Sequence, residues 1–293
     1  MKKLLCLTLT LALILCLCAC GSGGEGILRM TPELSFEQKL ARSAQALQAV
    51  GSFHMDMDMD MSMGIRVMGV DRSADVNTHH AADIRYEPMQ FSMEMEIASM
   101  GEQQKMLYYG EQAGDGLTVY YSMDNGAHWA RESIPSLEQV MPQEPGELTQ
   151  IFLSCTEGFS EAGKDSVNGT EVTVYTGLIS GDYVAQAIKA AGSLESVSQL
   201  LNVPVSEEMF RELADIPASV AIDEESGMVL RYTMDMSDAM GNLVSKLMEK
   251  LLEQYGGGSL PVEISMDQVN LTVTLSQFDQ VPEIVIPDAA RAA

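Results

Sequence analysis

The chain is poor in cationic residues. Its 293 residues include 17 Lys and Arg against 42 Asp and Glu, which gives a formal net charge of −25 at pH 7. This excess of negative charge repels the phosphates of nucleic acids and the head groups of anionic lipids. The composition therefore argues against a nucleic-acid-binding protein and against attachment to a membrane by charge.

Long apolar runs are scarce as well. The longest extends from Leu4 to Leu17, which is 14 residues, and a membrane-spanning helix needs about 20. Lys2 and Lys3 precede this run, and the hydrophobicity falls where it ends. This order is typical of a secretory signal peptide, here residues 1–19.

The residues at the end of this segment resemble the lipobox of bacterial lipoproteins. Leu17-Cys18-Ala19-Cys20 offers a bulky residue, two small ones and an acceptor thiol, and the Gly/Ser-rich residues 21–26 follow. The resemblance implies cleavage after Ala19 and a lipid on Cys20, with residues 20–30 as a flexible tether. The mature chain would have 274 residues and a net charge of −27, held at the extracytoplasmic face of a bacterial membrane by its lipid.

The sequence also lacks the motifs of common enzymes. There is no Gly-x-Ser-x-Gly elbow, no His-Glu-x-x-His pair and no glycine-rich phosphate loop, and Cys155 has no histidine near it in the sequence. Acylation of Cys20 would leave Cys155 without a partner for a disulfide. We therefore predict a protein that is not an enzyme, binds no cofactor and depends on a hydrophobic core.

The distribution of apolar residues predicts an α+β fold. Ser35 to Gln38 has the form of a capping box, and apolar residues at spacings of three and four predict a helix that ends at Gly51. After this helix the period changes to two, which is typical of strands with one buried face. Segments with strand character are 54–63, 91–97, 117–123, 172–178, 218–222, 228–236, 262–266 and 269–275, and further helices are expected at 136–154, 182–214 and 238–254.

Three turns connect these strands. Asn125-Gly126 and Asn168-Gly169 suit tight hairpins, with Trp129 expected in the strand after the first, and residues 223–227 form a third turn. About ten antiparallel strands with a few covering helices result. Because strands and helices alternate without a clear boundary, we predict a single domain over residues 31–293. The alternative is a second domain boundary near residues 155–165.

Several of these features together resemble a group of uncharacterised bacterial lipoproteins that are similar in fold to the LolA and LppX lipoprotein carriers. The resemblance is carried by the lipobox and by short motifs in a fixed order, namely Ala49–Phe53, Tyr120–Gly126 with Trp129, Val167–Thr170, Ile222-Asp223 with Gly227, and Ile284–Pro287. It implies a curved antiparallel sheet that forms an incomplete half-barrel covered by helices. In the carriers, the concave apolar face of this sheet binds lipid acyl chains.

The strand at 54–63 is the strongest local candidate for a binding surface. Its five methionines alternate with Asp and Ser and share one face, and methionine adapts to ligands of variable shape. The candidate wall for an apolar ligand comprises Met55, Met57, Met59, Met61, Met63, Phe91, Met93, Met95, Met234 and Met236. The alternative is a methionine-rich core packed on the helix at 36–50.

Metal sites are less well supported. Thioethers select Cu(I), but along one strand the sulfur atoms are too far apart for more than two to share an ion. Asp56, Asp58 and Asp60 begin like a calcium loop, yet Met61 and Val67 stand where that loop needs Gly and Glu. His79-His80 lacks neighbouring ligands and is expected at the surface, so we predict no metal.

Two functional hypotheses remain. The first is an anchored lipoprotein that binds an apolar or amphiphilic ligand, including lipid, in the concave face. The second is an interaction module without a ligand, which meets a protein partner in the cell envelope. The first requires an open apolar cavity of several hundred cubic ångströms, and the second requires a filled core.

Overall fold

The computed structural model describes residues 34–99, 101–135, 158–181, 213–254 and 262–293. Cys20, the tether, the predicted helix at 136–154 and almost all of the predicted helical region at 182–214 lie outside this part of the chain. None of the described helices is both long and apolar enough to cross a membrane.

The described strands form one antiparallel sheet of eleven strands, in the order β6-β5-β4-β3-β2-β1-β11-β10-β9-β8-β7. They are β1 (Ser52–Val67), β2 (Val70–Tyr86), β3 (Met89–Ser99), β4 (Glu102–Ala113), β5 (Gly116–Ser122), β6 (Ala130–Ile134), β7 (Ser160–Val167), β8 (Thr170–Ile179), β9 (Ile216–Ile222), β10 (Val229–Asp235) and β11 (Val262–Ser276). From β1 to β6, each strand pairs with the one before it. β7 forms the opposite edge, and the following strands pair in order up to β11, which pairs with β1. β6 and β7 follow one another among the described strands but lie at opposite edges of the sheet.

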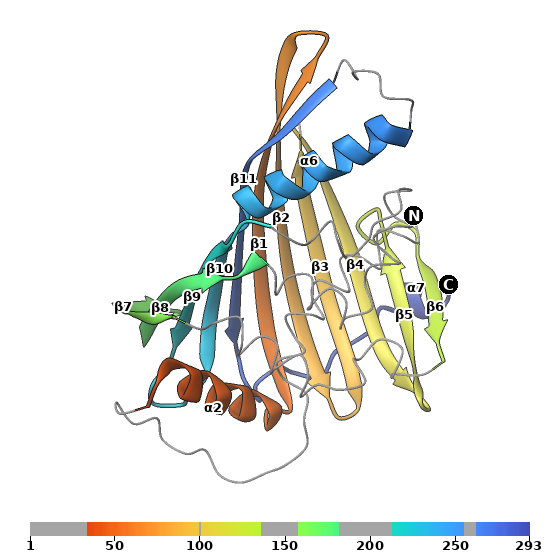
Figure 1. Cartoon of the computed structure of the whole chain (residues 1–293). Helices are drawn as coiled ribbons and strands as arrows, with labels where there is room; N and C mark the ends of the chain where they lie inside the picture. Colours follow the sequence, from red (N-terminus) through yellow and green to blue (C-terminus); the bar gives the residue numbers. More distant parts are fainter. Residues whose placement is uncertain (1–33, 100, 136–157, 182–212, 255–261) are drawn as a thin grey trace.

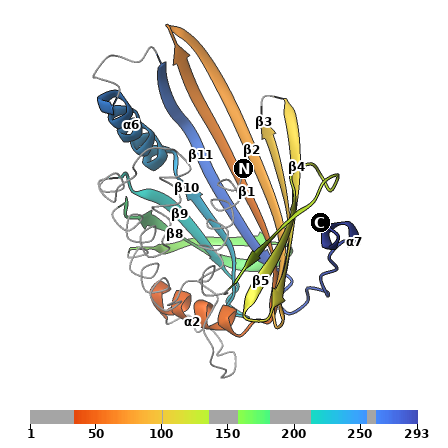
Figure 2. The ribbon, with the colours of Figure 1, turned by 90° about the vertical axis from the view of Figure 1, so that its right-hand side faces the viewer.

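The sheet is strongly curved, and its two faces are covered differently (Figures 1 and 2). Helices α2 (Phe36–Gln48) and α6 (Ser237–Gln254) lie on the concave side, α2 at one end of the strands and α6 toward the other. The short helix α7 (Asp288–Arg291) lies on the convex side beside β5. Among the described residues no pairing joins β6 to β7, so the barrel is incomplete, and the predicted fold class is confirmed.

Helix α2 begins where the sequence predicts. The Oγ atom of Ser35 accepts a hydrogen bond from the backbone N–H of Gln38 at 3.3 Å, and Oε1 of Gln38 accepts one from the N–H of Ser35 at 3.1 Å. At the buried side of the helix, Nζ of Lys39 lies 2.6 Å from the Tyr175 hydroxyl and 2.7 Å from a carboxylate oxygen of Glu224. This network ties α2 to β8 and to the β9–β10 turn.

Replacing Ser35 with alanine is expected to lower the free energy of unfolding by about 1 kcal/mol, because the N–H of Gln38 loses its acceptor. Ser35→Asp is the matched control, since its carboxylate can cap the same N–H. Urea denaturation followed by circular dichroism measures both. An alanine variant as stable as the wild type would show that the capping box contributes nothing.

The sheet departs from the sequence prediction at two places. The predicted strands at 262–266 and 269–275 are one strand, β11, because Ser62 pairs with Gln268 while Met63 pairs with Met266, which leaves Asp267 as an extra bulged residue. Asn168 and Gly169 form the predicted two-residue turn, both with positive φ. By contrast, β6 begins only at Ala130, so Asn125-Gly126 belongs to a longer connection that also contains Trp129.

The alternation of side chains divides the sheet into an apolar concave face and a mostly polar convex face. Residues of the concave face form one buried cluster with Phe36, Leu40 and Leu47 of α2. A second, small cluster lies on the convex side, where Ile286 and Ala290 cover Tyr120, with Tyr109 and Trp129 packed against them. The protein thus has one main core inside the curve of the sheet.

Candidate functional site

The concave face is continuous across the central strands. The register places Met57 of β1 opposite Val273 of β11 on one side and opposite His80 of β2 on the other, and His80 lies opposite Met95 of β3. Directly paired residues have their Cβ atoms about 5 Å apart on the same face. The predicted methionines therefore share their face with the inward residues of the neighbouring strands.

The predicted wall divides into a buried part and a partly exposed part. Met55, Met57 and Met95 are 1–2% exposed and belong to the main cluster with α2. Phe91 and Met93 are also buried there. The half-buried members are Met59, Met61, Met63, Met234 and Met236.

The partly exposed part lies toward the end of the sheet where α6 crosses it. Met59, Met234 and Met236 pack against the main cluster, as do Leu243 and Leu247 of α6. Helix α6 contacts β11, and Figure 1 shows it across the concave side above α2. The methionines at the α2 end of the wall thus belong to the core, as the alternative interpretation predicted. Those at the α6 end are partly accessible.

Replacing Met57 or Met59 with leucine is expected to lower the free energy of unfolding by less than about 1.5 kcal/mol in each variant, because the volume is conserved. Met57 is 2% exposed, whereas Met59 is half-buried, so the change should come mainly from Met57. Thermal and urea denaturation of the single variants measure this. A larger loss at Met59 than at Met57 would contradict the division of the wall described above.

His79 and His80 occupy opposite faces of β2. His79 is exposed, and its Nδ1 lies 2.7 Å from a carboxylate oxygen of Asp58. His80 is only 3% exposed, so the expectation of a surface histidine was wrong for this residue. Burial, with a smaller effect of His79, lowers the pKa of His80 to about 4 and keeps its ring neutral at pH 7.

On the convex face, the outward residues of β1 are matched to the polar residues opposite them on β2. Nδ1 of His54 lies 2.7 Å from Asp83, and the Asn77 amide donates to Asp60. Together with Asp58 and His79, these pairs form a row of polar contacts. Through this row, the Asp residues of β1 contribute to the pairing of β1 with β2.

The aromatic residues near the first Asn-Gly pair support the C-terminal segment. The Tyr120 hydroxyl donates to Glu111 at 2.9 Å, and the guanidinium of Arg291 in α7 makes two hydrogen bonds to the same carboxylate at 2.9 and 3.0 Å. Tyr109 and Trp129 pack beside them, with ring centres 5.9 Å apart. These rings pack the C-terminal segment on the convex face.

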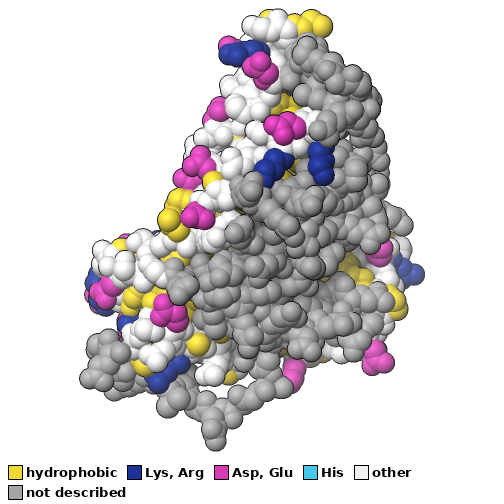
Figure 3. Space-filling view, in the orientation of Figure 1, with side chains coloured by type: hydrophobic (Ala, Val, Ile, Leu, Met, Phe, Trp, Pro, Cys, Tyr) yellow, Lys and Arg dark blue, Asp and Glu magenta, His cyan; other side chains and the backbone are white. Residues whose placement is uncertain are grey.

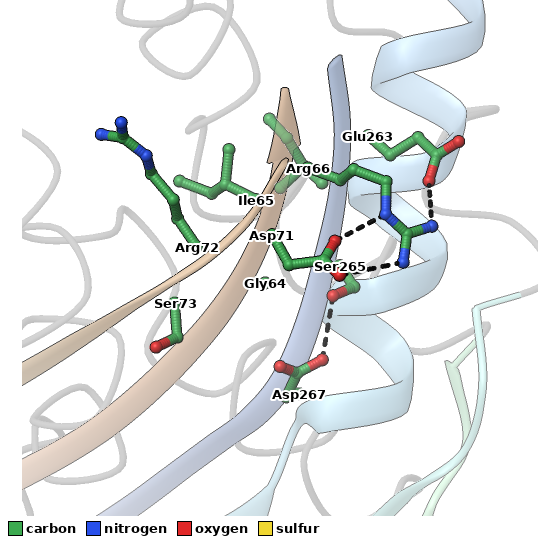
Figure 4. Close-up of a pocket in the computed structure, with 10 residues that line it drawn as sticks. Gly64, Ile65, Arg66, Asp71, Arg72, Ser73, Glu263, Ser265 and Asp267 are labelled. Carbon is green, nitrogen blue, oxygen red and sulfur yellow. Dashed lines mark hydrogen bonds and ion pairs between the residues drawn. The ribbon is translucent and has the colours of Figure 1, made fainter. Parts of the chain in front are cut away.

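A pocket of about 660 Å³ lies beside the β1–β2 hairpin (Figure 4). Its lining includes several charged side chains, and Arg66 donates to Asp71 at 2.6 Å and to Glu263 at 3.0 Å. These contacts raise the pKa of Arg66 and lower that of Asp71. Because Arg66 pairs with both Asp71 and Glu263 here, this pocket differs in character from the methionine wall.

The hairpin projects beyond the rest of the sheet and ends in apolar side chains. Met68 is 80% exposed and Val70 is 58% exposed, and Figure 3 shows hydrophobic side chains at this end of the molecule.

Within the described residues, no group of three or more His, Cys, Asp and Glu side chains is arranged to hold a metal ion.

The contribution of β2 and β4 to the concave face was not predicted from the sequence. Inward residues of these strands include Thr78, His80, Met106 and Tyr108, all less than 10% exposed. The Tyr108 hydroxyl contacts the sulfur atoms of Met106 and Met123 at 3.6 and 3.7 Å. The signal was weak because both strands carry polar residues on both faces.

Comparison with protein families gives a match to a family without an assigned function. Residues 35–150 match the model of a family of unknown function, DUF6612. The matched region covers fewer than half of the residues and includes β1 to β6. A search of curated proteins gives no match.

Comparison with solved structures gives matches that include LppX, one of the carriers named in the sequence resemblance. LprF from Mycobacterium bovis matches with a TM-score of 0.44 and 13% identity over 90% of this chain and 100% of that one. The Mycobacterium tuberculosis lipoprotein LppX matches with a TM-score of 0.35 and 15% identity over 85% and 97%. A DUF1329 family protein from Desulfovibrio piger matches with a TM-score of 0.18 and 8% identity over 86% and 94%.

Proposed function

We propose that this protein is a lipoprotein of the bacterial cell envelope that binds an apolar or amphiphilic ligand in the concave face of its sheet and catalyses no reaction. A lipid on Cys20 holds it at the extracytoplasmic face of the membrane. Its net charge gives it no attraction to anionic lipid, so the lipid anchor is what keeps it there. The short Gly/Ser tether keeps the domain close to the bilayer.

The observation that carries this proposal is the partly exposed end of the methionine wall. A closed core would bury all the alternate methionines of β1, but Met59, Met61 and Met63 retain exposed surface while Met55 and Met57 do not. A row of flexible thioethers at an accessible concave surface suits ligands of variable shape.

The test is native mass spectrometry, with lipid extraction, on the mature chain carrying Cys20→Ser. Co-purifying apolar molecules, or uptake of a fluorescent fatty-acid methyl ester, are expected when the methionine wall is unchanged. Reproducible absence of both would overturn the proposal in favour of the interaction module.

A matched pair of variants locates the ligand. Met61→Glu places a charge on the concave face and is expected to abolish uptake, because burying a carboxylate beside an apolar ligand is costly. Ala98→Glu adds the same charge on the convex face, opposite Asn77 and Gln103, and is expected to leave uptake unchanged. Equal loss in both variants would place the ligand elsewhere.

A further inference from the structure

Two buried polar atoms on the concave face have no hydrogen-bond partner. They are Oγ1 of Thr78 and Nδ1 of His80, whose residues are 9% and 3% exposed. No described residue donates to or accepts from either atom. An unpaired buried polar group typically costs about 1–3 kcal/mol, and native structures rarely retain one without a reason.

The two residues are placed to act on one bound molecule. They are two positions apart on β2, so their side chains share a face and lie about 7 Å apart along the strand. Methionines stand opposite both of them on β1, Met59 beside Thr78 and Met57 beside His80. The two polar atoms therefore interrupt the apolar wall where its buried part meets its partly exposed part.

We infer that Thr78 and His80 form a polar subsite in the ligand-binding face, which takes the oxygen atoms of an uncharged group, such as an ester or hydroxyl, within an otherwise apolar lipid. This inference rests on the proposed function and specifies its ligand class. A hydrocarbon chain would lie on the methionines, while its oxygen atoms would pair with the hydroxyl of Thr78 and the imidazole of His80.

The charge state of the site favours an uncharged oxygen group over a carboxylate. A pKa of about 4 leaves His80 neutral at pH 7, so its ring offers one donor and one acceptor but no positive charge. An ionised carboxylate buried beside neutral partners would lose its hydration without gaining an ion pair. An ester or hydroxyl loses far less on entering the same place.

The test compares retention of an ester with retention of an alkane of the same number of carbon atoms. The mature Cys20→Ser chain is stripped of lipid, equilibrated with dodecane and methyl undecanoate delivered from cyclodextrin, purified again and extracted for gas chromatography. The ester-to-alkane ratio is then compared between the parent and a variant with Thr78→Val and His80→Leu, so that differences in water solubility cancel. We expect the ratio to fall about tenfold in the variant, as the loss of two hydrogen bonds predicts.

Ser43→Ala is the matched control. The hydroxyl of Ser43 is also buried without a partner, but it lies on α2, so its removal should leave the ratio unchanged. Thr78→Val alone decides the question if the double variant does not fold, and it should lower the ratio by a smaller factor. Retention of both probes with the same ratio in all variants would overturn the subsite and leave the proposed function standing. A parent chain that retains neither probe would overturn the proposed function.

Discussion

Replacing Phe91 with alanine is expected to lower the free energy of unfolding by about 3–5 kcal/mol. Phe91 is 8% exposed on the concave face of β3, where it belongs to the main cluster. Its cross-strand partner on β4 is Gly110, and the Phe91 ring occupies the space where a side chain of that residue would lie. Truncation therefore opens a cavity over the bare backbone of Gly110. Urea denaturation of the mature chain, followed by circular dichroism, measures the loss.

The same pair permits a double-mutant cycle. A Cβ atom at Gly110 would fall under 3.0 Å from three atoms of the Phe91 ring, so Gly110→Ala alone should cost about 1–3 kcal/mol through overpacking. In the Phe91→Ala background the clash is gone, and the added methyl group should be neutral or stabilising. Additive effects of the two substitutions would show that the ring does not rest on Gly110.

The sequence was informative about strands whose two faces differ in character. In β1 the alternation of Met with Asp identified both the strand and its inward face, because one face packs on the core and the other forms polar pairs with β2. The capping box of α2 and the Asn168-Gly169 turn were equally clear, since each depends only on local chemistry. Such features need no knowledge of the rest of the fold.

Features that depend on neighbouring strands were not predictable. The bulge at Asp267 arises from the register between β11 and β1, and a single strand carries no signal for it. Strand β2 places Thr78 and His80 inward and Asn77 and His79 outward, so both faces read as polar in the sequence. Only the pairing with Met57 and Met95 reveals that His80 is part of the concave wall.

The candidate ligand wall was predicted as a set, but its internal division was not. Met55 and Met63 are equivalent in the alternating pattern, yet only Met55 lies in the main cluster with α2. That difference depends on where the two helices cross the sheet, which no local pattern encodes. Ligand binding by the wall stays a prediction, which the native mass spectrometry and the uptake experiment test.

The protein is expected to lose stability through His80 as the pH falls. The pKa of His80 is lowered from 6.5 to about 4 in the folded state, mainly by burial, so the unfolded chain binds a proton more readily than the folded one. The stability contributed by the neutral ring is complete above pH 6.5 and is lost as the pH falls toward 4. Between pH 7 and pH 4.5 this loss amounts to about 2 kcal/mol. Urea denaturation of the parent and of His80→Leu at both pH values isolates it, because other groups titrate equally in both proteins.

His54 supplies a control of opposite sign on the convex face. Its hydrogen bonds and charge interactions with Asp83 and Asp56 outweigh the effect of burial and raise its pKa above 6.5. The stability that these contacts add is therefore present below pH 6.5 and is lost as the pH rises through the raised value. His54→Gln should consequently lose most stability relative to the parent near pH 5 and least near pH 8, whereas the advantage of His80→Leu over the parent should grow toward pH 4.5. Parallel curves for the parent and His80→Leu would mean that His80 can take up a proton in the folded protein, which contradicts a neutral imidazole held among methionines.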